Sequence, residues 1–83
     1  MEASQERLQV ALSELARARV HVRFKRVSGR FRRAEYELLV NGARRGGYAR
    51  HEGLLDGQPV PGATLPTWKL ACCERLLFEA RYR

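Results

Sequence analysis

The segment from His51 to Asp56, which also contains Glu52, is the one cluster in this chain that combines an imidazole with carboxylates. Such groups could transfer protons, but catalysis would also need a positioned nucleophile or an oxyanion-stabilising group. No such signature accompanies the cluster. We therefore interpret His51 as a residue at the end of a loop, and we expect no catalytic residue and no enzymatic activity.

Cys72, Cys73, His21 and His51 are the only plausible zinc ligands. Adjacent cysteines on a helix point about 100° apart, and the chain has no Cys-x-x-Cys or His-x-x-x-His spacing. We expect no metal and no other cofactor. The neighbouring cysteines cannot form the disulfide framework of a small secreted domain, which agrees with a reducing compartment. We expect Cys73 in the core and Cys72 partly exposed.

Positive charge is the strongest signal in the composition. The net charge is +7, and 14 of the 16 cations are Arg. Residues 17–50 hold eleven cations against Glu35 and Glu37, whereas the segments on either side are negative or balanced. This excess predicts an anionic partner. Arg favours planar contacts to phosphate, although a GC-rich genome would produce the same bias with no functional meaning.

A predicted hairpin with its turn at Ser28-Gly29-Arg30 gathers five of these cations at its tip, with no acid among them and with Phe31 on its outward face. They are Lys25, Arg26, Arg30, Arg32 and Arg33. Two-stranded ribbons fit the DNA major groove, where Arg contacts guanine edges or phosphates. The alternative is a solvated hairpin that only maintains solubility. A second basic group surrounds Gly46-Gly47 and could extend the same surface, although such glycines are more often turn or bulge residues. The predicted nucleic-acid-binding residues are Arg23, Lys25, Arg26, Arg30, Phe31, Arg32, Arg33, Arg44, Arg45 and Arg50.

The elements that position these residues follow from hydrophobic periodicity. Apolar residues recur with helical spacing from Glu2 to about Arg19. From Val20 the period changes to two, which predicts a strand, and a second strand follows up to Val40. A three-residue loop would place Val22 opposite Tyr36, Phe24 opposite Ala34 and Val20 opposite Leu38, with Arg23–Glu35 and His21–Glu37 as outward pairs.

Asn41-Gly42 predicts a second turn, and residues 45–51 could return as a third strand. The segment from Gly53 to Ala63 is rich in Gly and Pro and is expected to be a long loop. Thr64 or Thr67 should cap a final helix that runs to about Arg81.

The final helix has two apolar strips. One comprises Leu70, Cys73, Leu76, Leu77 and Ala80 and should face the sheet. The second contains Trp68, Phe78 and Tyr82, which we predict as a protein interface in a homodimer or with another partner. The alternative is that the N-terminal helix packs there.

The order α-β-β-β-α resembles that of the double-stranded-RNA-binding domain. Val40-Asn41-Gly42 and Gly46-Gly47 lie where that family has its second turn and its glycine-rich third strand. The lysine-rich motif that begins the last helix of that family is absent here. The segment from Val22 to Arg50 also resembles the three-stranded sheet of plant AP2-type and phage integrase arm-binding domains. Neither resemblance has a diagnostic motif, so no family is assigned.

Together these patterns predict a single α+β domain over residues 1–83, a small antiparallel two- or three-stranded meander flanked by two helices. No apolar run is long enough to cross a bilayer and no signal peptide is evident, so we expect a cytoplasmic protein that does not enter membranes. The expected function is DNA or RNA binding through the arginine-rich face of the sheet. The alternative is a small protein-binding inhibitor or adaptor, for example of phage or mobile-element origin, that docks on an acidic or nucleic-acid-binding protein.

Overall fold

A computed structural model describes residues 2–27, 35–61 and 64–82, and the statements below concern these residues. They form two helices and a five-stranded antiparallel sheet whose strands lie in sequence order. The elements are α1 (Glu2–Arg17), β1 (Val22–Arg26), β2 (Tyr36–Val40), β3 (Ala43–Ala49), β4 (Glu52–Leu55), β5 (Gln58–Pro59) and α2 (Leu65–Arg81). The predicted α+β class with a helix at each end is confirmed, although the sheet has five strands instead of two or three.

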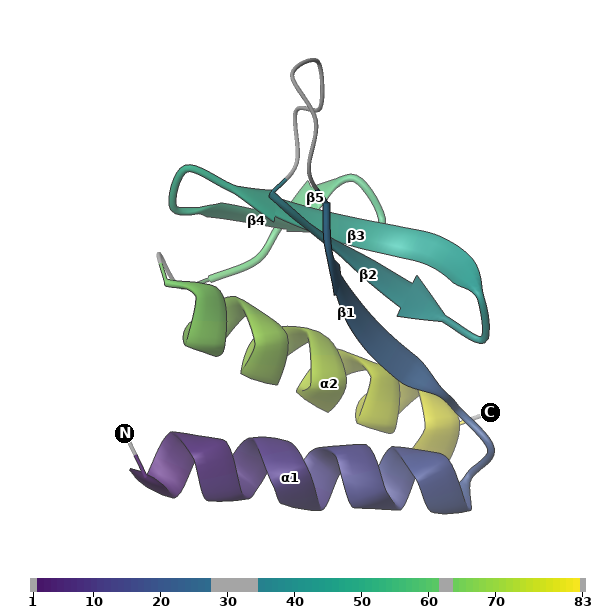
Figure 1. Cartoon of the computed structure of the whole chain (residues 1–83). Helices are drawn as coiled ribbons and strands as arrows, with labels where there is room; N and C mark the ends of the chain where they lie inside the picture. The colour runs from purple at the N-terminus through teal and green to yellow at the C-terminus, as the bar shows by residue number, and fades with distance from the viewer. Residues whose placement is uncertain (1, 28–34, 62–63, 83) are drawn as a thin grey trace.

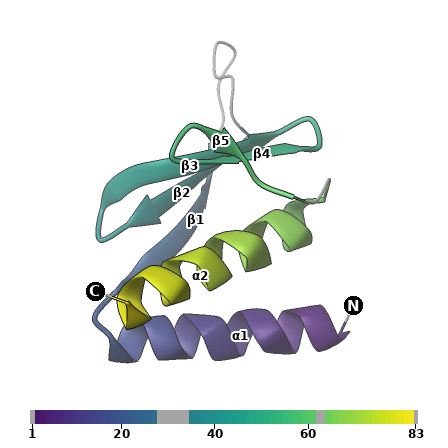
Figure 2. The ribbon, with the colours of Figure 1, turned by 180° about the vertical axis from the view of Figure 1, so that it is seen from behind.

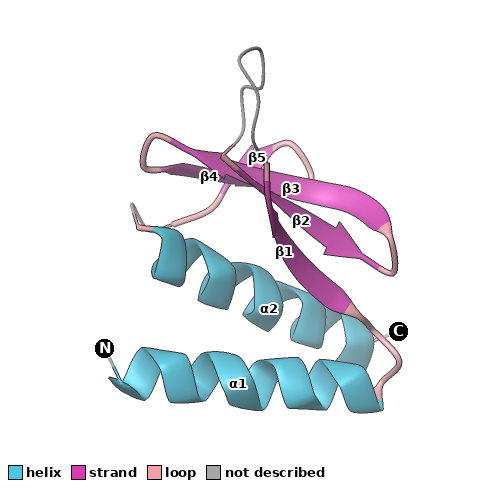
Figure 3. Ribbon diagram, in the orientation of Figure 1, coloured by secondary structure: helices cyan, strands magenta, loops and turns pink. Residues whose placement is uncertain are grey.

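The elements stack in three layers, with α2 between the sheet and α1 (Figures 1 and 3). The view from behind shows the same order of layers, with the chain leaving β5 toward the start of α2 (Figure 2). Because α2 is covered on two sides, it contributes buried residues to two core clusters, Cys73 and Leu76 to one and Trp68 and Cys72 to the other.

The end of α1 differs from the prediction. Arg19 has a φ of 61°, its N–H donates to the Ala16 carbonyl (3.0 Å), and the Val20 N–H donates to the Leu15 carbonyl (2.9 Å). This is a Schellman motif, in which Val20 packs in the same cluster as Leu15. The prediction that Val20 begins a strand is therefore wrong, and the strand starts at Val22. The sequence hid this helix end because Arg occupies the left-handed position that Gly usually takes.

The first two strands pair with each other as predicted, but the predicted register is wrong. Phe24 lies opposite Leu38, where Ala34 was expected, so the pairing is displaced by four residues. A displacement by an even number leaves every side chain on its predicted face of the sheet. The residues that the alternation predicted to face the core therefore still do so.

Contacts at both ends of the hairpin explain why the register is displaced. The Val27 N–H donates to the Glu35 carbonyl at 2.9 Å, so the connection is longer than the three residues expected, and residues 28–34 lie outside the described part of the chain. At the other end, the His21 N–H donates to Asn41 Oδ1 and the Asn41 N–H to the His21 carbonyl, each at 2.8 Å. The Asn41 side chain thus fixes the register.

Three two-residue turns build the rest of the sheet, and all six of their residues have left-handed φ. They are Asn41-Gly42 (49° and 85°), Arg50-His51 (50° and 66°) and Asp56-Gly57 (51° and 79°). Positive φ at both central positions is the requirement of a type I′ hairpin. The predicted third strand is confirmed as β3. The expected long loop after Gly53 is wrong, because Asp56-Gly57 is a hairpin turn between two further strands.

The predicted final helix is confirmed, with Thr64 as its N-cap. The Thr67 N–H donates to Thr64 Oγ1, and the Thr64 N–H donates back to Thr67 Oγ1. Cys73 and Leu76 pack with α1, whereas Cys72 packs with the sheet. The expected partial exposure of Cys72 is wrong, since the residue is fully buried.

Trp68 is the centre of the core between α2 and the sheet, with none of its surface exposed. Its ring centroid lies 5.4 Å from that of Phe24 and 5.6 Å from that of Tyr48. Its Nε1–H donates to the Leu54 carbonyl at 3.2 Å. Gly53 leaves room for the ring, because a Cβ there would lie 2.2 Å from Trp68 Cδ1. The prediction that Trp68 belongs to a protein interface is therefore wrong.

Candidate nucleic-acid interface

The aromatic rings of the sheet face the helices, and its charges face outward. Phe24, Tyr36 and Tyr48 all belong to the core around Trp68. Alternation then places Arg23 and Lys25 of β1 on the opposite, outer face. The described outer face therefore presents cations without an aromatic ring among them.

The structure places six of the ten predicted nucleic-acid-binding residues. Arg30, Phe31, Arg32 and Arg33 lie outside the described residues. The other six do not form one surface. Arg23, Lys25 and Arg44 share the outer face, whereas Arg26 lies opposite Tyr36 on the helix side of β1. Arg45 lies in a bulge of β3, and Arg50 lies in the turn between β3 and β4.

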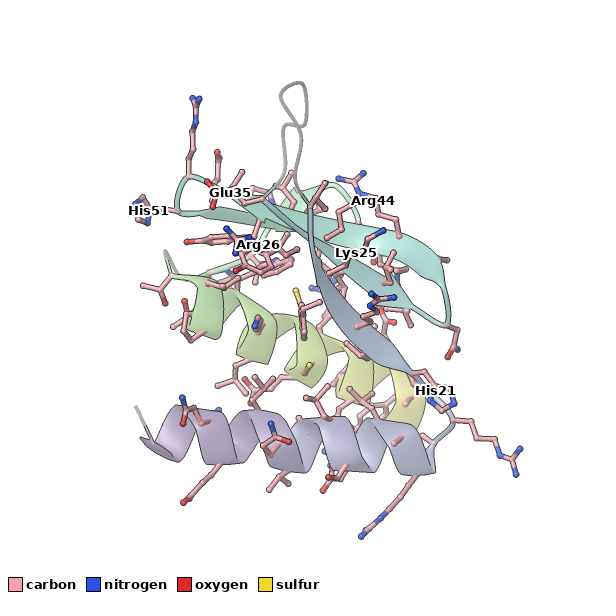
Figure 4. The ribbon with its side chains drawn as sticks, viewed as in Figure 1. His21, Lys25, Arg26, Glu35, Arg44 and His51 are labelled. Carbon is pink, nitrogen blue, oxygen red and sulfur yellow. The ribbon has the colours of Figure 1, made fainter. Side chains whose placement is uncertain are left out.

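The outward partners on β1 differ from those predicted. With the observed register, Glu37 lies opposite Lys25 and not opposite His21, and Arg23 lies opposite Leu39 and not Glu35. Glu37 also forms a salt bridge with Arg44 at 2.9 Å. Figure 4 shows Lys25 and Arg44 on neighbouring parts of the sheet. Of the three outer-face cations, Arg44 is thus already neutralised within the chain.

Arg45 has a structural role. The ladder between β2 and β3 is irregular between Leu38 and Leu39, which leaves Arg45 without a cross-strand partner. Its guanidinium binds Asp56 with two hydrogen bonds of 2.6 and 2.7 Å and reaches Glu79 of α2 at 3.3 Å. The hydrogen bond raises the pKa of Arg45 and lowers that of Asp56. This residue ties the sheet to α2 and is not available to a phosphate without breaking that tie.

Two cations of the helical layer are also paired. Arg7 of α1 lies 2.8 Å from Glu74 of α2, and Arg81 of α2 lies 2.7 Å from Glu14 of α1. These exposed bridges each contribute little to stability, about 0–1 kcal/mol. Their relevance here is that they cancel charge on this side of the molecule.

Five of the remaining cations follow one edge of the fold, from the end of α1 along β1, whereas Arg50 and Arg75 lie elsewhere. We name the five residues concerned the cationic edge. None of them takes part in a salt bridge with another described residue. They are Arg17, Arg19, Arg23, Lys25 and Arg26, all of them exposed.

Lys69 adds a cation that the sequence did not single out. Its Nζ lies 5.5 Å from the ring centroid of Phe24 and 5.7 Å from that of Tyr36, which is cation–π distance. The lone lysine of α2 thus lies on the helix side of β1, where Arg26 is the neighbour of Tyr36 across the strands. No sequence motif marks this contact, because only the packing of α2 creates it.

The suspected acid–base cluster is not assembled. His51 lies in the turn before β4 and Asp56 in the turn after it, at opposite ends of that strand, and Asp56 is engaged by Arg45. Burial raises the pKa of both Cys72 and Cys73 to about 12, so both are neutral thiols at physiological pH. Within residues 2–27, 35–61 and 64–82, no three His, Cys, Asp or Glu side chains gather where a metal ion could bind.

A second surface lies on the side of α2 that neither α1 nor the sheet covers. Phe78 and Tyr82 are 60% and 74% exposed, and their ring centroids lie 4.6 Å apart. Beside Phe78, a groove of about 390 Å³ runs between α2 and β5, lined by Pro59, Val60 and Ala71 among others. Two of the three residues predicted for a protein interface are therefore exposed together.

No family model, no curated protein and no solved structure matches this chain. In the described part of the chain, neither helix is long and apolar enough to cross a membrane.

Proposed function

We propose that this protein is a cytoplasmic, non-catalytic nucleic-acid-binding domain that contacts the phosphate backbone through its cationic edge and the adjoining β1–β2 hairpin. The observation that carries this proposal is the distribution of paired and unpaired charge. Arg7 and Arg81 of the helical layer and Arg44 and Arg45 of β3 are bound to carboxylates. The cations of β1 are exposed and form no salt bridge with another described residue. Unpaired, exposed Arg and Lys release counterions when they neutralise phosphates, and this favours binding.

The placement of the aromatic residues favours a duplex over a single strand. Single-strand binders stack bases on aromatic side chains of an exposed sheet face. Here Phe24, Tyr36 and Tyr48 point into the core, and the described outer face carries Leu39 and Leu54 in place of rings. Phosphate contacts to a duplex need no such platform.

The proposal is tested by titrating labelled duplex DNA, duplex RNA and single-stranded DNA with the protein at two salt concentrations, with fluorescence anisotropy as the readout. We expect tighter binding to at least one duplex than to the single strand, with an affinity that falls steeply as salt increases. An affinity for all three nucleic acids that does not depend on salt would contradict the proposal.

The second candidate is a protein-binding adaptor that uses the exposed pair Phe78 and Tyr82 and the neighbouring groove. Neighbouring aromatic rings at this level of exposure are typical of interface anchors. Light scattering at high protein concentration tests the homodimeric form of this idea. A dimer that Phe78→Ser with Tyr82→Ser converts to monomer would support it, and a monomer at all concentrations would leave only a heterologous partner for this surface.

A further inference from the structure

The backbone of β1 has one unused side. The Val27 N–H donates to Glu35, and the His21 carbonyl accepts from Asn41, so the odd-numbered residues of this strand bond to β2. In an antiparallel ladder, the residues between them turn their N–H and C=O groups the other way. These residues are Val22, Phe24 and Arg26, and among the described strands β2 is the only neighbour of β1 in the sheet.

The opposite edge of the sheet is different. β5 has only two residues, and one of them is Pro59, which has no N–H to offer. Short strands and prolines are common means of protecting an edge. β1 has five residues and no proline, so it is the edge on which another strand could pair.

The charges on β1 determine which strand that could be. Two copies of β1 could pair as antiparallel neighbours with their core-facing sides aligned. In a register centred on residue 23, 24 or 25, Arg23 or Lys25 of one copy would then lie directly opposite Arg23 or Lys25 of the other. Like charges directly opposite each other are destabilising. The edge therefore disfavours a second copy of this chain and favours a strand with acidic side chains on the outer face.

We propose that β1 binds an extended acidic segment of a partner protein by adding it to the sheet as a sixth strand. Alternate acidic residues of the segment lie beside Arg23 and Lys25, and the residues between them lie beside Val22 and Phe24, which are only partly buried. Main-chain hydrogen bonds provide the affinity and the alternating side chains provide the specificity, as in other cases of strand addition. This inference goes beyond nucleic-acid binding, because it depends on the backbone of β1 as well as on its charge.

A capped heptapeptide of alternating Glu and Val, labelled for fluorescence anisotropy, tests the inference without nucleic acid. Two N-methylated forms serve as matched probes, one methylated on the Glu nitrogens and the other on the Val nitrogens. Both keep the charge, but an added strand uses only one alternate set of its N–H groups toward β1. We expect one methylated form to bind about tenfold more weakly than the other, or worse. Equal binding of the two forms would overturn the proposal, as would equal binding of an alternating Lys and Val peptide.

Two variants of the protein complete the test. Arg26→Pro and Arg26→Ala remove the same charge from an exposed position at the end of β1, but only the proline also removes an edge N–H. We expect the Pro variant to bind the peptide several-fold more weakly than the Ala variant. Hydrogen exchange of the wild-type protein should show slower exchange of the Val22, Phe24 and Arg26 amides when the peptide is bound. Unchanged exchange at these amides in a saturated complex would contradict strand addition even if the variants fold poorly.

Discussion

Replacing Gly53 by Ala is the sharpest test of how the core around Trp68 is built. The added Cβ would lie 2.2 Å from Trp68 Cδ1 and 2.7 Å from Cγ. Ordinary contact begins at about 3.4 Å, so the ring would have to move by about 1.2 Å, the difference between 3.4 and 2.2 Å. The ring has little freedom to do so, because Phe24 and Tyr48 flank it and Nε1 is bound to the Leu54 carbonyl.

The expected cost follows from three contributions. Overpacking costs about 1–3 kcal/mol, and weakening of the indole hydrogen bond costs about 1 kcal/mol more. Against these, Ala restricts the unfolded chain and returns about 0.4–1 kcal/mol. We therefore expect the free energy of unfolding to fall by about 2 kcal/mol, which corresponds to a decrease in Tm of about 8–16 °C for a chain of this length.

Urea denaturation measures this change conveniently, because Trp68 is the only tryptophan and its fluorescence reports on the same site. The control is Gly53→Ala combined with Trp68→Leu, followed by circular dichroism. Since the smaller side chain removes the clash, the Gly53 substitution should cost less than about 1 kcal/mol in that background. A loss of less than about 0.5 kcal/mol for Gly53→Ala in the wild-type background would refute this description of the core.

Other expected outcomes concern the two thiols and the hydrogen bonds that Arg45 makes to Asp56 and Glu79. Cys72 and Cys73 should resist alkylation in the native protein at pH 8 and react in denaturant, so fast native labelling would contradict their burial. Because their folded pKa is raised to about 12, the unfolded state loses its thiol protons first, and stability should fall as pH rises from about 9 to 12. A Cys→Ala pair should show a smaller fall over that range. For Asp56 the folded pKa is lowered, so its contribution to stability is present at neutral pH and disappears as acid protonates it. Arg45→Ala should therefore flatten the acid side of the stability profile measured by urea denaturation, and an unchanged profile would argue against the tie.

The sequence was sufficient for the type and order of the long elements. Helical spacing located both helices, and period-two alternation identified which faces of β1 and β2 are buried, even though the register was displaced by four residues. Register depends on where a ladder starts, and here that is decided by the Asn41 side chain and by Val20 at the end of α1. The Asn41 side chain bonds to a residue 20 positions away in the sequence, and Val20 packs in a cluster with residues of both helices. Periodicity reports neither contact.

The strands after β3 were missed for a different reason. Asp56-Gly57 is a recognised hairpin signal, but the flanking strands are too short to show alternation, and the prolines nearby suggested a loop. Trp68 was misplaced because the strip with Cys73 and Leu76 was expected to face the sheet, whereas those residues pack with α1 and Trp68 packs against the sheet. Once α2 lies between two layers, a residue on its second strip is buried as well.

At the candidate interface, sequence identified the basic segment but not which cations are free. Arg44 and Arg45 are adjacent in sequence to glycines that suggested a phosphate contact, yet each meets a carboxylate brought by another strand or by α2. Conversely, Arg17 and Arg19 were not predicted as site residues, and they join the cationic edge only because α1 ends beside β1.

The most direct test of the central claim compares two double variants of equal charge in duplex binding. Arg23→Ala with Lys25→Ala removes two cations from the cationic edge, and Arg75→Ala with Arg81→Ala removes two from α2. All four side chains are exposed, so each substitution should change stability by less than about 0.5 kcal/mol. If each edge cation neutralises one phosphate, the slope of log affinity against log salt should become shallower by about 1.8, two contacts at about 0.9 each, in the edge variant alone. Equal changes in both variants would contradict a localised phosphate contact, and an unchanged slope in the edge variant would remove β1 from the binding site.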